Sequence, residues 1–308
     1  MDRFKSAKKA SILGIVGNIF LLVIKAVIGF MTGSRAMIAD AMNSASDIFS
    51  SLMTLIGNRI ASQPSDEDHN LGHGKAEYIY SLLISLTMIV LGLTVAADSL
   101  KSLVQKEIFT FSIWLVIICI LTILTKLSLY LYTKRVAKKY NNLLMKANCE
   151  DHKNDCIITS INLLAIILGK FGIYFVDGIV GFGIAVWIMK TGIEIFKESY
   201  DVLMDKSIDN KTKELVYEIV KEHDKVLGMT GFHSAPVGYQ YQIFFTIQVD
   251  GNLKTFESHK IANHLEKEIT KSIPEIFLTV IHVDPVHVKK KVLCQIVLVK
   301  DFDKNVRG

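Results

Sequence analysis

Long apolar segments separated by short polar ones dominate the first two thirds of the chain. Each approaches the roughly 20 residues that an α-helix needs to cross a bilayer. Their order is Ser11–Met31, Ala36–Ile60, Ile79–Leu103, Phe111–Tyr132, Asn148–Gly169 and Ile173–Phe196. The pattern predicts an all-α transmembrane domain with six helices over residues 1–200.

The pattern changes after Phe196, where charged residues become frequent and short helical and strand-like segments alternate. Helical periodicity covers Asn210–His223 and Thr255–Lys271, and strand-like alternation covers Met229–Val237, Tyr241–Val249 and Phe277–Val283. Helix–strand–strand–helix–strand predicts an α+β domain of ferredoxin-like type over residues 201–290, with the helices on one face of the sheet. Residues 291–308 form a tail in which Lys291–Val299 is a candidate edge strand.

Composition and charge agree with a membrane protein. Half of the 308 residues are hydrophobic and the net charge is +5, without a nucleic-acid-binding motif. We therefore expect membrane lipid, and no nucleic acid, as a partner. Basic residues concentrate at the N-terminus and in the segment from Lys134 to Lys146. Because basic loops stay in the cytoplasm, both termini are expected there.

The cysteine pattern argues against a disulfide-stabilised protein, and the absence of a nucleophile–base pair argues against an enzyme. Cys119, Cys149, Cys156 and Cys294 form no CxxC pair and no disulfide framework, as expected for a protein exposed to a reducing cytoplasm. No nucleophile–base pair stands out, so we expect neither an enzyme nor an organic cofactor.

Two pairs of oxygen-bearing side chains with the same spacing are the main candidate site. Asn43 and Asp47 lie one helical turn apart in the second apolar segment, and Asp151 and Asp155 repeat this spacing in the fifth. Two such helices would supply four ligands to a divalent cation. The alternative is helix caps and interhelical hydrogen bonds.

The type of ligand indicates which cation would bind. Carboxylate and amide oxygens suit Mn²⁺, Mg²⁺ or Ca²⁺, whereas imidazole and thiolate favour Zn²⁺ and Cu²⁺. His152 and Cys156 are adjacent to the aspartates, but a helix turns by about 100° per residue and should direct them elsewhere.

Another charge in the apolar segments calls for a partner. Lys25 lies in mid-span, where a charge is costly, and the simplest expectation is a structural pair with Asp40.

Two further groups are weaker candidates. Asp66, His69 and His73 give an oxygen and two imidazoles within a short polar loop, enough for three ligands of a zinc-like site. The alternative is a solvated loop. In the α+β domain the candidates are His233, His259, His282 and Asp284, and the alternative there is that the histidines are surface residues.

Together these motifs resemble the cation diffusion facilitator family of divalent-metal/proton antiporters. The matching segments are Thr32–Asp47, Gln63–Glu77, Ala147–Asp155 and Ile281–Pro285. The resemblance implies a homodimer with cytoplasmic dimerisation domains, and a transport site at Asn43, Asp47, Asp151 and Asp155. It also implies a second metal site at Asp66, His69 and His73, metal ligands in the cytoplasmic domain, and a salt bridge between Lys75 and Asp205.

Two departures from the zinc-transporting members concern the ligands. Asn43 stands where those members usually carry Asp or His, and Asp151 stands where they usually carry His. Both departures resemble the bacterial manganese-exporting branch. Ser234 stands where some relatives have an aspartate, which argues against a full two-metal site there.

We therefore expect an exporter of Mn²⁺ driven by protons in a bacterial plasma membrane. One alternative is export of Zn²⁺, Fe²⁺, Co²⁺ or Cd²⁺ by the same architecture. The other is a membrane metal sensor that binds the ion without transporting it.

Overall fold

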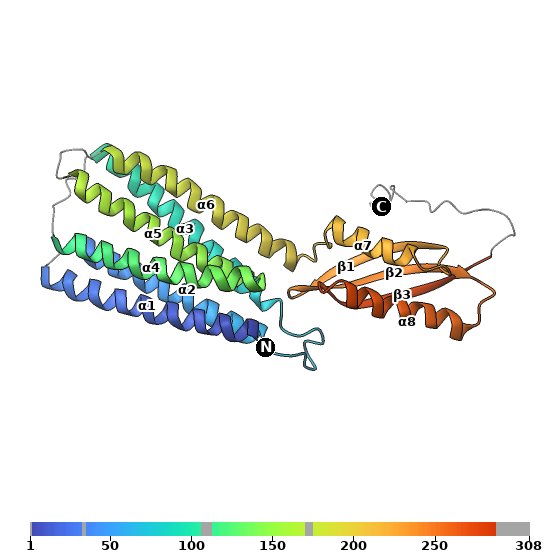
Figure 1. Cartoon of the computed structure of the whole chain (residues 1–308). Helices are drawn as coiled ribbons and strands as arrows, with labels where there is room; N and C mark the ends of the chain where they lie inside the picture. Colours follow the sequence, from blue (N-terminus) through green and yellow to red (C-terminus); the bar gives the residue numbers. More distant parts are fainter. Residues whose placement is uncertain (1, 33–34, 106–112, 170–174, 288–308) are drawn as a thin grey trace. The chain divides into compact units, whose positions relative to one another are not determined.

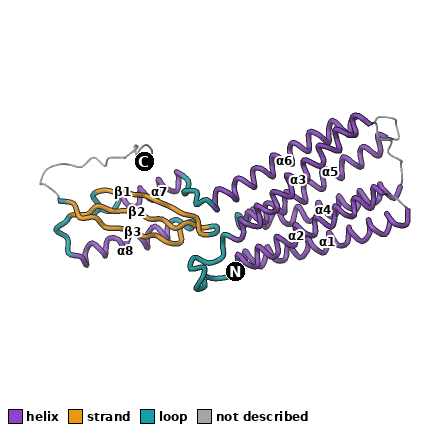
Figure 2. Tube along the Cα trace, turned by 180° about the vertical axis from the view of Figure 1, so that it is seen from behind, coloured by secondary structure: helices purple, strands orange, loops and turns teal. Residues whose placement is uncertain are grey.

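The computed structural model describes residues 2–32, 35–105, 113–169 and 175–287, and the side chains of most of them. The chain divides into two compact units, Met1–Met204 and Asp205–Gly308. The first unit is helical, and the second combines a sheet with helices (Figures 1 and 2). The tail from residue 288 onward, with its candidate edge strand, lies outside the described residues.

The first unit is a bundle of long helices that run side by side (Figure 1). The described helices are α1 (Asp2–Thr32), α2 (Arg35–Ala61), α3 (Ala76–Gln105), α4 (Ile113–Tyr140), α5 (Leu143–Gly169) and α6 (Phe175–Leu203). Among the described residues, three stretches are long and apolar enough to cross a membrane: Arg3–Met31, Ala76–Lys101 and Ile113–Tyr140. Each helix corresponds to one predicted span, and six membrane crossings remain a prediction.

The surface of the bundle is apolar and parts of its interior are polar. In α1, Val16 is 59% exposed and Phe30 is 75% exposed, whereas Asn18 and Lys25 are buried. Water would favour the reverse arrangement, because exposed large side chains lose the free energy of apolar burial. The arrangement suits a bundle whose outer face contacts lipid.

Helices α3 and α6 pack closely because glycines lie at their contact. A Cβ at Gly92 would come within 2.5 Å of the Met189 side chain and 3.1 Å of the Ala185 carbonyl oxygen. A Cβ at Gly192 would meet Ile89 at 2.9 Å. Small residues at helix contacts are a common way for helices to associate in membranes.

The basic segment from Lys134 to Lys146, which lies between the predicted fourth and fifth spans, is mostly helical rather than a loop, because α4 and α5 extend into it. Only Asn141 and Asn142 connect the two helices. Asn141 has a positive φ of 45°, and the Asn142 side-chain oxygen accepts a hydrogen bond of 2.7 Å from the Met145 amide. These asparagines provide the turn and the helix cap, so the basic side chains lie on helix ends.

A buried ion pair joins three helices near the N-terminus of α1. The Arg3 guanidinium lies 2.7 Å from one Glu77 oxygen, and the other Glu77 oxygen accepts a 2.8 Å hydrogen bond from the Leu143 amide. Glu77 thus pairs with α1 and caps the first turn of α5 from α3. Its negative charge lies at the positive end of the α5 dipole.

The second unit has the predicted element order. It consists of α7 (Asn210–Lys221), β1 (Gly228–Val237), β2 (Gln240–Asp250), α8 (Thr255–Ser272) and β3 (Ile276–Val286). The sheet order is β1-β2-β3, with β1 antiparallel and β3 parallel to β2. The parallel pair requires a crossover, which α8 provides.

Alternation along β2 separates the two faces of this sheet. Ile243, Phe245, Ile247 and Val249 are buried in a core with Val216 of α7, Leu265 of α8 and their neighbours. Phe244, Thr246 and Gln248 face the other way and are more exposed. The helices therefore cover one face only, as predicted.

The Glu77 contacts predict a large effect of one substitution. Glu77→Ala should lower the free energy of unfolding by about 3 kcal/mol, because removal of one partner leaves Arg3 and the α5 amide without the carboxylate. The matched control is Glu198→Ala, which removes the half-exposed Lys146–Glu198 pair of 2.5 Å. The control should cost less than about 1 kcal/mol. Denaturant unfolding of the purified protein in detergent measures both values, and equal losses would contradict this role of Glu77.

Candidate metal centre

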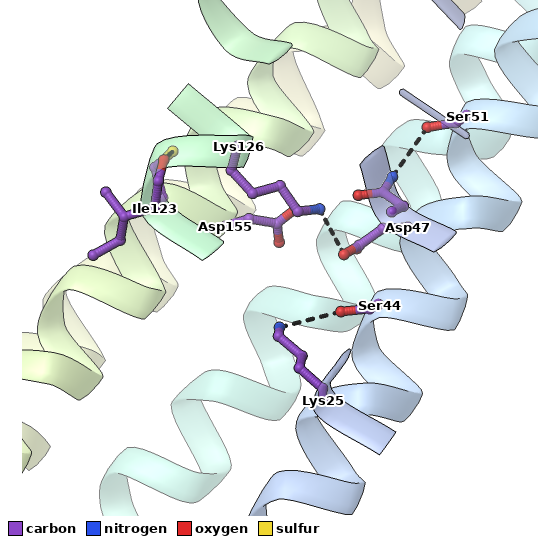
Figure 3. Close-up of polar contacts among 9 residues, drawn as sticks. Lys25, Ser44, Asp47, Ser51, Ile123, Lys126 and Asp155 are labelled. Atoms are coloured by element: carbon purple, nitrogen blue, oxygen red, sulfur yellow. Dashed lines mark hydrogen bonds and ion pairs between the residues drawn. The ribbon is translucent and has the colours of Figure 1, made fainter. Parts of the chain in front are cut away.

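A row of polar residues lies along the face of α2 that meets its neighbouring helices. Ser44, Asp47 and Ser51 recur at a spacing of one turn. The Lys25 ammonium of α1 donates a 3.1 Å hydrogen bond to the Ser44 hydroxyl (Figure 3). The Asn18 amide donates a 3.3 Å hydrogen bond to the Ser51 hydroxyl. These contacts place Asp47 between two polar pairs.

The structure brings three of the four predicted ligands together. Asp47 of α2 and Asp151 and Asp155 of α5 each offer an oxygen, and these oxygens all lie within 4.8 Å of one another. The residues are between 4% and 6% exposed. Three carboxylates so close and so deeply buried repel one another, so the cluster needs positive charge nearby.

Lys126 of α4 supplies part of that charge. Its ammonium lies 2.6 Å from Asp47 Oδ2 and 2.5 Å from Asp155 Oδ2, and the side chain is 1% exposed (Figure 3). Sequence reasoning missed this residue. A lysine in the middle of an apolar span was the available signal, the same one that singled out Lys25.

The ammonium does not satisfy all the carboxylate oxygens. Asp151 Oδ2 and Asp155 Oδ1 are buried and have no hydrogen-bond partner among the described residues. Buried polar atoms are normally hydrogen-bonded, and exceptions call for an explanation. A cluster of three buried acidic side chains in which some oxygens lack donors is suited to receive a cation.

Softer ligands next to the aspartates do not join this group. His152 is fully buried, but its ring nitrogens are not among the ligand atoms of the cluster. The Cys156 thiol donates to the Ile123 carbonyl oxygen of α4 at 3.8 Å. The helical-phase prediction for these two residues is therefore confirmed, and the described cluster contains oxygen ligands only.

Two predicted partners fall on side chains that the structure does not describe. Asn43 lies in α2 one turn before Asp47, but its side chain lies outside the described part of the structure. The same holds for Asp40, so the Lys25–Asp40 pair stays a prediction.

The loop between α2 and α3 gathers its three candidate ligands. Asp66 Oδ1 lies 3.2 Å from His69 Nδ1, and Asp66 Oδ2 lies 3.3 Å from His73 Nε2. The imidazole ring centroids are 4.4 Å apart. A 2.6 Å hydrogen bond from the His69 amide, with further contributions from both imidazoles, holds the pKa of Asp66 below its usual range. The carboxylate is thus ionised at neutral pH and close to both rings.

The candidates in the second unit do not form one cluster within the described chain. His282 Nε2 lies 3.0 Å from Asp284 Oδ1 on the exposed face of β3. His233 lies on β1, with β2 between it and β3, and His259 lies on α8 in the helical layer. No group of three ligand atoms is found among the described residues of this unit. These ligands and the Lys75–Asp205 bridge remain predictions.

Sequence comparisons agree with both units. The family described as the cation efflux transmembrane domain matches residues 11–204, and the cytoplasmic domain of cation efflux proteins matches residues 208–286.

Three relatives match nearly their whole length. The manganese efflux system protein MneS of Bacillus subtilis is 31% identical over 94% of this chain and 99% of its own. MneP of the same organism, also called a manganese efflux system protein, is 25% identical over 92% and 98%. The cation-efflux pump FieF of Shewanella oneidensis is 29% identical over 92% and 95%. The chain thus belongs to the cation efflux (cation diffusion facilitator) family, whose members are multi-pass membrane transporters of divalent metal cations rather than enzymes.

Proposed function

We propose that this transporter exports Mn²⁺ from the cytoplasm across a bacterial plasma membrane in exchange for protons. The observation that carries the proposal is the buried cluster of Asp47, Asp151 and Asp155, which offers oxygen atoms alone. Hard oxygen ligands suit Mn²⁺ and limit capture by Zn²⁺, which binds most nitrogen and sulfur sites more tightly. The names of MneS and MneP support the same ion.

In this mechanism the carboxylates replace part of the hydration shell of the ion. Asp47 comes from α2 and the other two from α5, so the cation joins two helices, and the Asn43 amide oxygen is the proposed fourth ligand. A rearrangement of α2 against α5 opens the site to the outside. Protons then compete for the carboxylates and favour release of the metal.

The remaining parts of the proposal concern assembly and regulation. The match of residues 208–286 to the cytoplasmic domain of the family supports a homodimer with both termini in the cytoplasm. Asp66, His69 and His73 form a second metal site in the loop. His233, His259, His282 and Asp284 contribute to a site completed by the dimer, and the Lys75–Asp205 salt bridge lies near the dimer contact.

A second candidate keeps the mechanism and changes the ion to Zn²⁺, Fe²⁺, Co²⁺ or Cd²⁺. The similarity to FieF supports this alternative, because the chain is also related to a cation-efflux pump that is not named for manganese. The oxygen-only cluster argues for Mn²⁺ over Zn²⁺, and it discriminates less between Mn²⁺ and Fe²⁺ because both accept oxygen ligands.

Flux through proteoliposomes tests the transport site. Asp47→Asn keeps the size of the side chain and removes one ligand charge, so Mn²⁺ uptake driven by a pH gradient should fall by about 100-fold, more than for a residue that only supports a ligand. Asp98→Asn is the matched control, because Asp98 is an exposed carboxylate of α3 outside the cluster. Wild-type flux should be higher for Mn²⁺ than for Zn²⁺. Mn²⁺ bound without any flux would instead indicate a sensor.

Selectivity tests the ligand assignment. Asn43→His introduces an imidazole one turn from Asp47 and should shift the ratio of Mn²⁺ to Zn²⁺ flux toward Zn²⁺ by on the order of tenfold. Asn252→His, on the loop after β2, serves as the control for an added imidazole elsewhere. An unchanged ratio in Asn43→His would argue against Asn43 as a ligand.

The loop site is tested by its spectrum with Co²⁺, which reports imidazole coordination. The double variant His69→Ala, His73→Ala should weaken the loop component of Co²⁺ binding by at least on the order of tenfold, because two of three ligands are lost. The control is His264→Ala, an exposed histidine of α8 that lies 3.5 Å from Glu268. Equal Co²⁺ absorption in both proteins would leave the loop as a solvated segment.

A further inference from the structure

Lys126 reaches the proposed transport site from a helix that supplies none of the ligands. Its ammonium contacts one oxygen of Asp47 and one of Asp155, so it lies between the α2 and α5 contributions to the cluster (Figure 3). The contacts are short and the side chain is almost fully buried. A positively charged group therefore already occupies the point where the two helices offer negative charge.

A lysine with a purely structural role would be expected to complete the hydrogen bonding of its partners. This one leaves Asp151 Oδ2 and Asp155 Oδ1 without partners among the described residues. The cluster also gathers three acidic side chains against the single ammonium of Lys126, and the nearest other ammonium, that of Lys25, is hydrogen-bonded to Ser44. Buried oxygens without donors therefore remain in the cluster when Lys126 is in place.

The ammonium and a metal ion cannot share the same oxygens. Oxygen ligands hold small divalent cations at about 2.0–2.6 Å. A metal bound to Asp47 and Asp155 would therefore lie close to the present position of the ammonium. Repulsion between cations at such separations is strong away from water. The flexible four-carbon stem of lysine allows the ammonium to withdraw while α4 stays in place.

We propose that Lys126 is a tethered counter-cation that alternates with the transported metal for Asp47 and Asp155. This inference rests on the proposed function of the cluster as the transport site. When the metal leaves, the ammonium returns to the two carboxylates, which hinders rebinding of the metal. It also neutralises part of the empty site while the carrier resets, when bare carboxylates would be costly within the membrane.

Substitution by a neutral side chain of similar length separates this role from a structural one. In Lys126→Met, Mn²⁺ no longer competes with an ammonium, so binding should become tighter by on the order of tenfold or more, given the usual strength of charge-assisted hydrogen bonds. Mn²⁺ flux should show a lower KM and a lower kcat, because release becomes slower. A residue that only shapes the site would give weaker or unchanged binding when removed.

The experiment measures Mn²⁺ binding to the full-length protein in detergent and Mn²⁺ flux in proteoliposomes, at one fixed pH. The Mn²⁺ binding that the wild type shows and the Asp47→Asn variant lacks is assigned to the transport site. Lys134→Met is the matched control, because Lys134 lies two turns further along α4 and donates to the Tyr130 hydroxyl at 2.7 Å. It should bind Mn²⁺ like the wild type, and Lys126→Arg, which keeps the charge, should not show the tighter binding.

The outcomes are distinguishable. Tighter Asp47-dependent binding in Lys126→Met alone supports the proposal, and unchanged or weaker binding overturns it. If Lys126→Met does not fold, Lys126→Gln gives the same comparison with a polar neutral side chain. If the Asp47→Asn variant binds and transports Mn²⁺ like the wild type, the transport site itself is refuted, whatever the effect of the Lys126 variants.

Discussion

Negative charge held away from water is the constraint on which the first unit depends. Asp47, Asp151 and Asp155 are brought within 4.8 Å of one another in a bundle whose outer surface is apolar. Burial of even one unpaired carboxylate is costly, and three in contact are costly several times over. Such a cluster persists only where cations are available, and both the Lys126 ammonium and the substrate supply positive charge.

The surrounding helices hold these charges in position. Hydrogen bonds from Asn18 to Ser51 and from Lys25 to Ser44 fix α1 against the polar face of α2 on either side of Asp47. Glycine contacts hold α3 close to α6, and the Arg3–Glu77 pair joins α1, α3 and the start of α5. These polar contacts do not depend on a hydrophobic driving force between the helices, which lipid does not provide. The ligands themselves come from the two other helices, Asp47 from α2 and Asp151 and Asp155 from α5.

The sequence predicted what depends on local spacing. The repeated one-turn pairs on two apolar segments identified the carboxylates, and Asp66, His69 and His73 are close enough in sequence for one loop to gather them. The alternating pattern of β2 predicted which face of the sheet the helices cover. The order of helices and strands in the second unit followed from the same reasoning.

Contacts between distant helices were beyond this reasoning. Lys126 is far in sequence from Asp47, and spacing alone does not show which face of α4 meets the cluster. His233, His259 and His282 lie on separate elements, and the fold of one chain does not bring them together. The predicted fourth and fifth spans leave the basic segment from Lys134 to Lys146 between them, whereas the helices continue into it and two asparagines provide the turn and the cap.

The most direct test of this account is the structure of the Mn²⁺-loaded protein, with the metal located by its anomalous X-ray scattering. The account predicts an anomalous peak bound by oxygens of Asp47, Asp151 and Asp155, with the Lys126 ammonium withdrawn from the two carboxylates it now contacts. A metal bound elsewhere, with Lys126 still bridging Asp47 and Asp155, would contradict it.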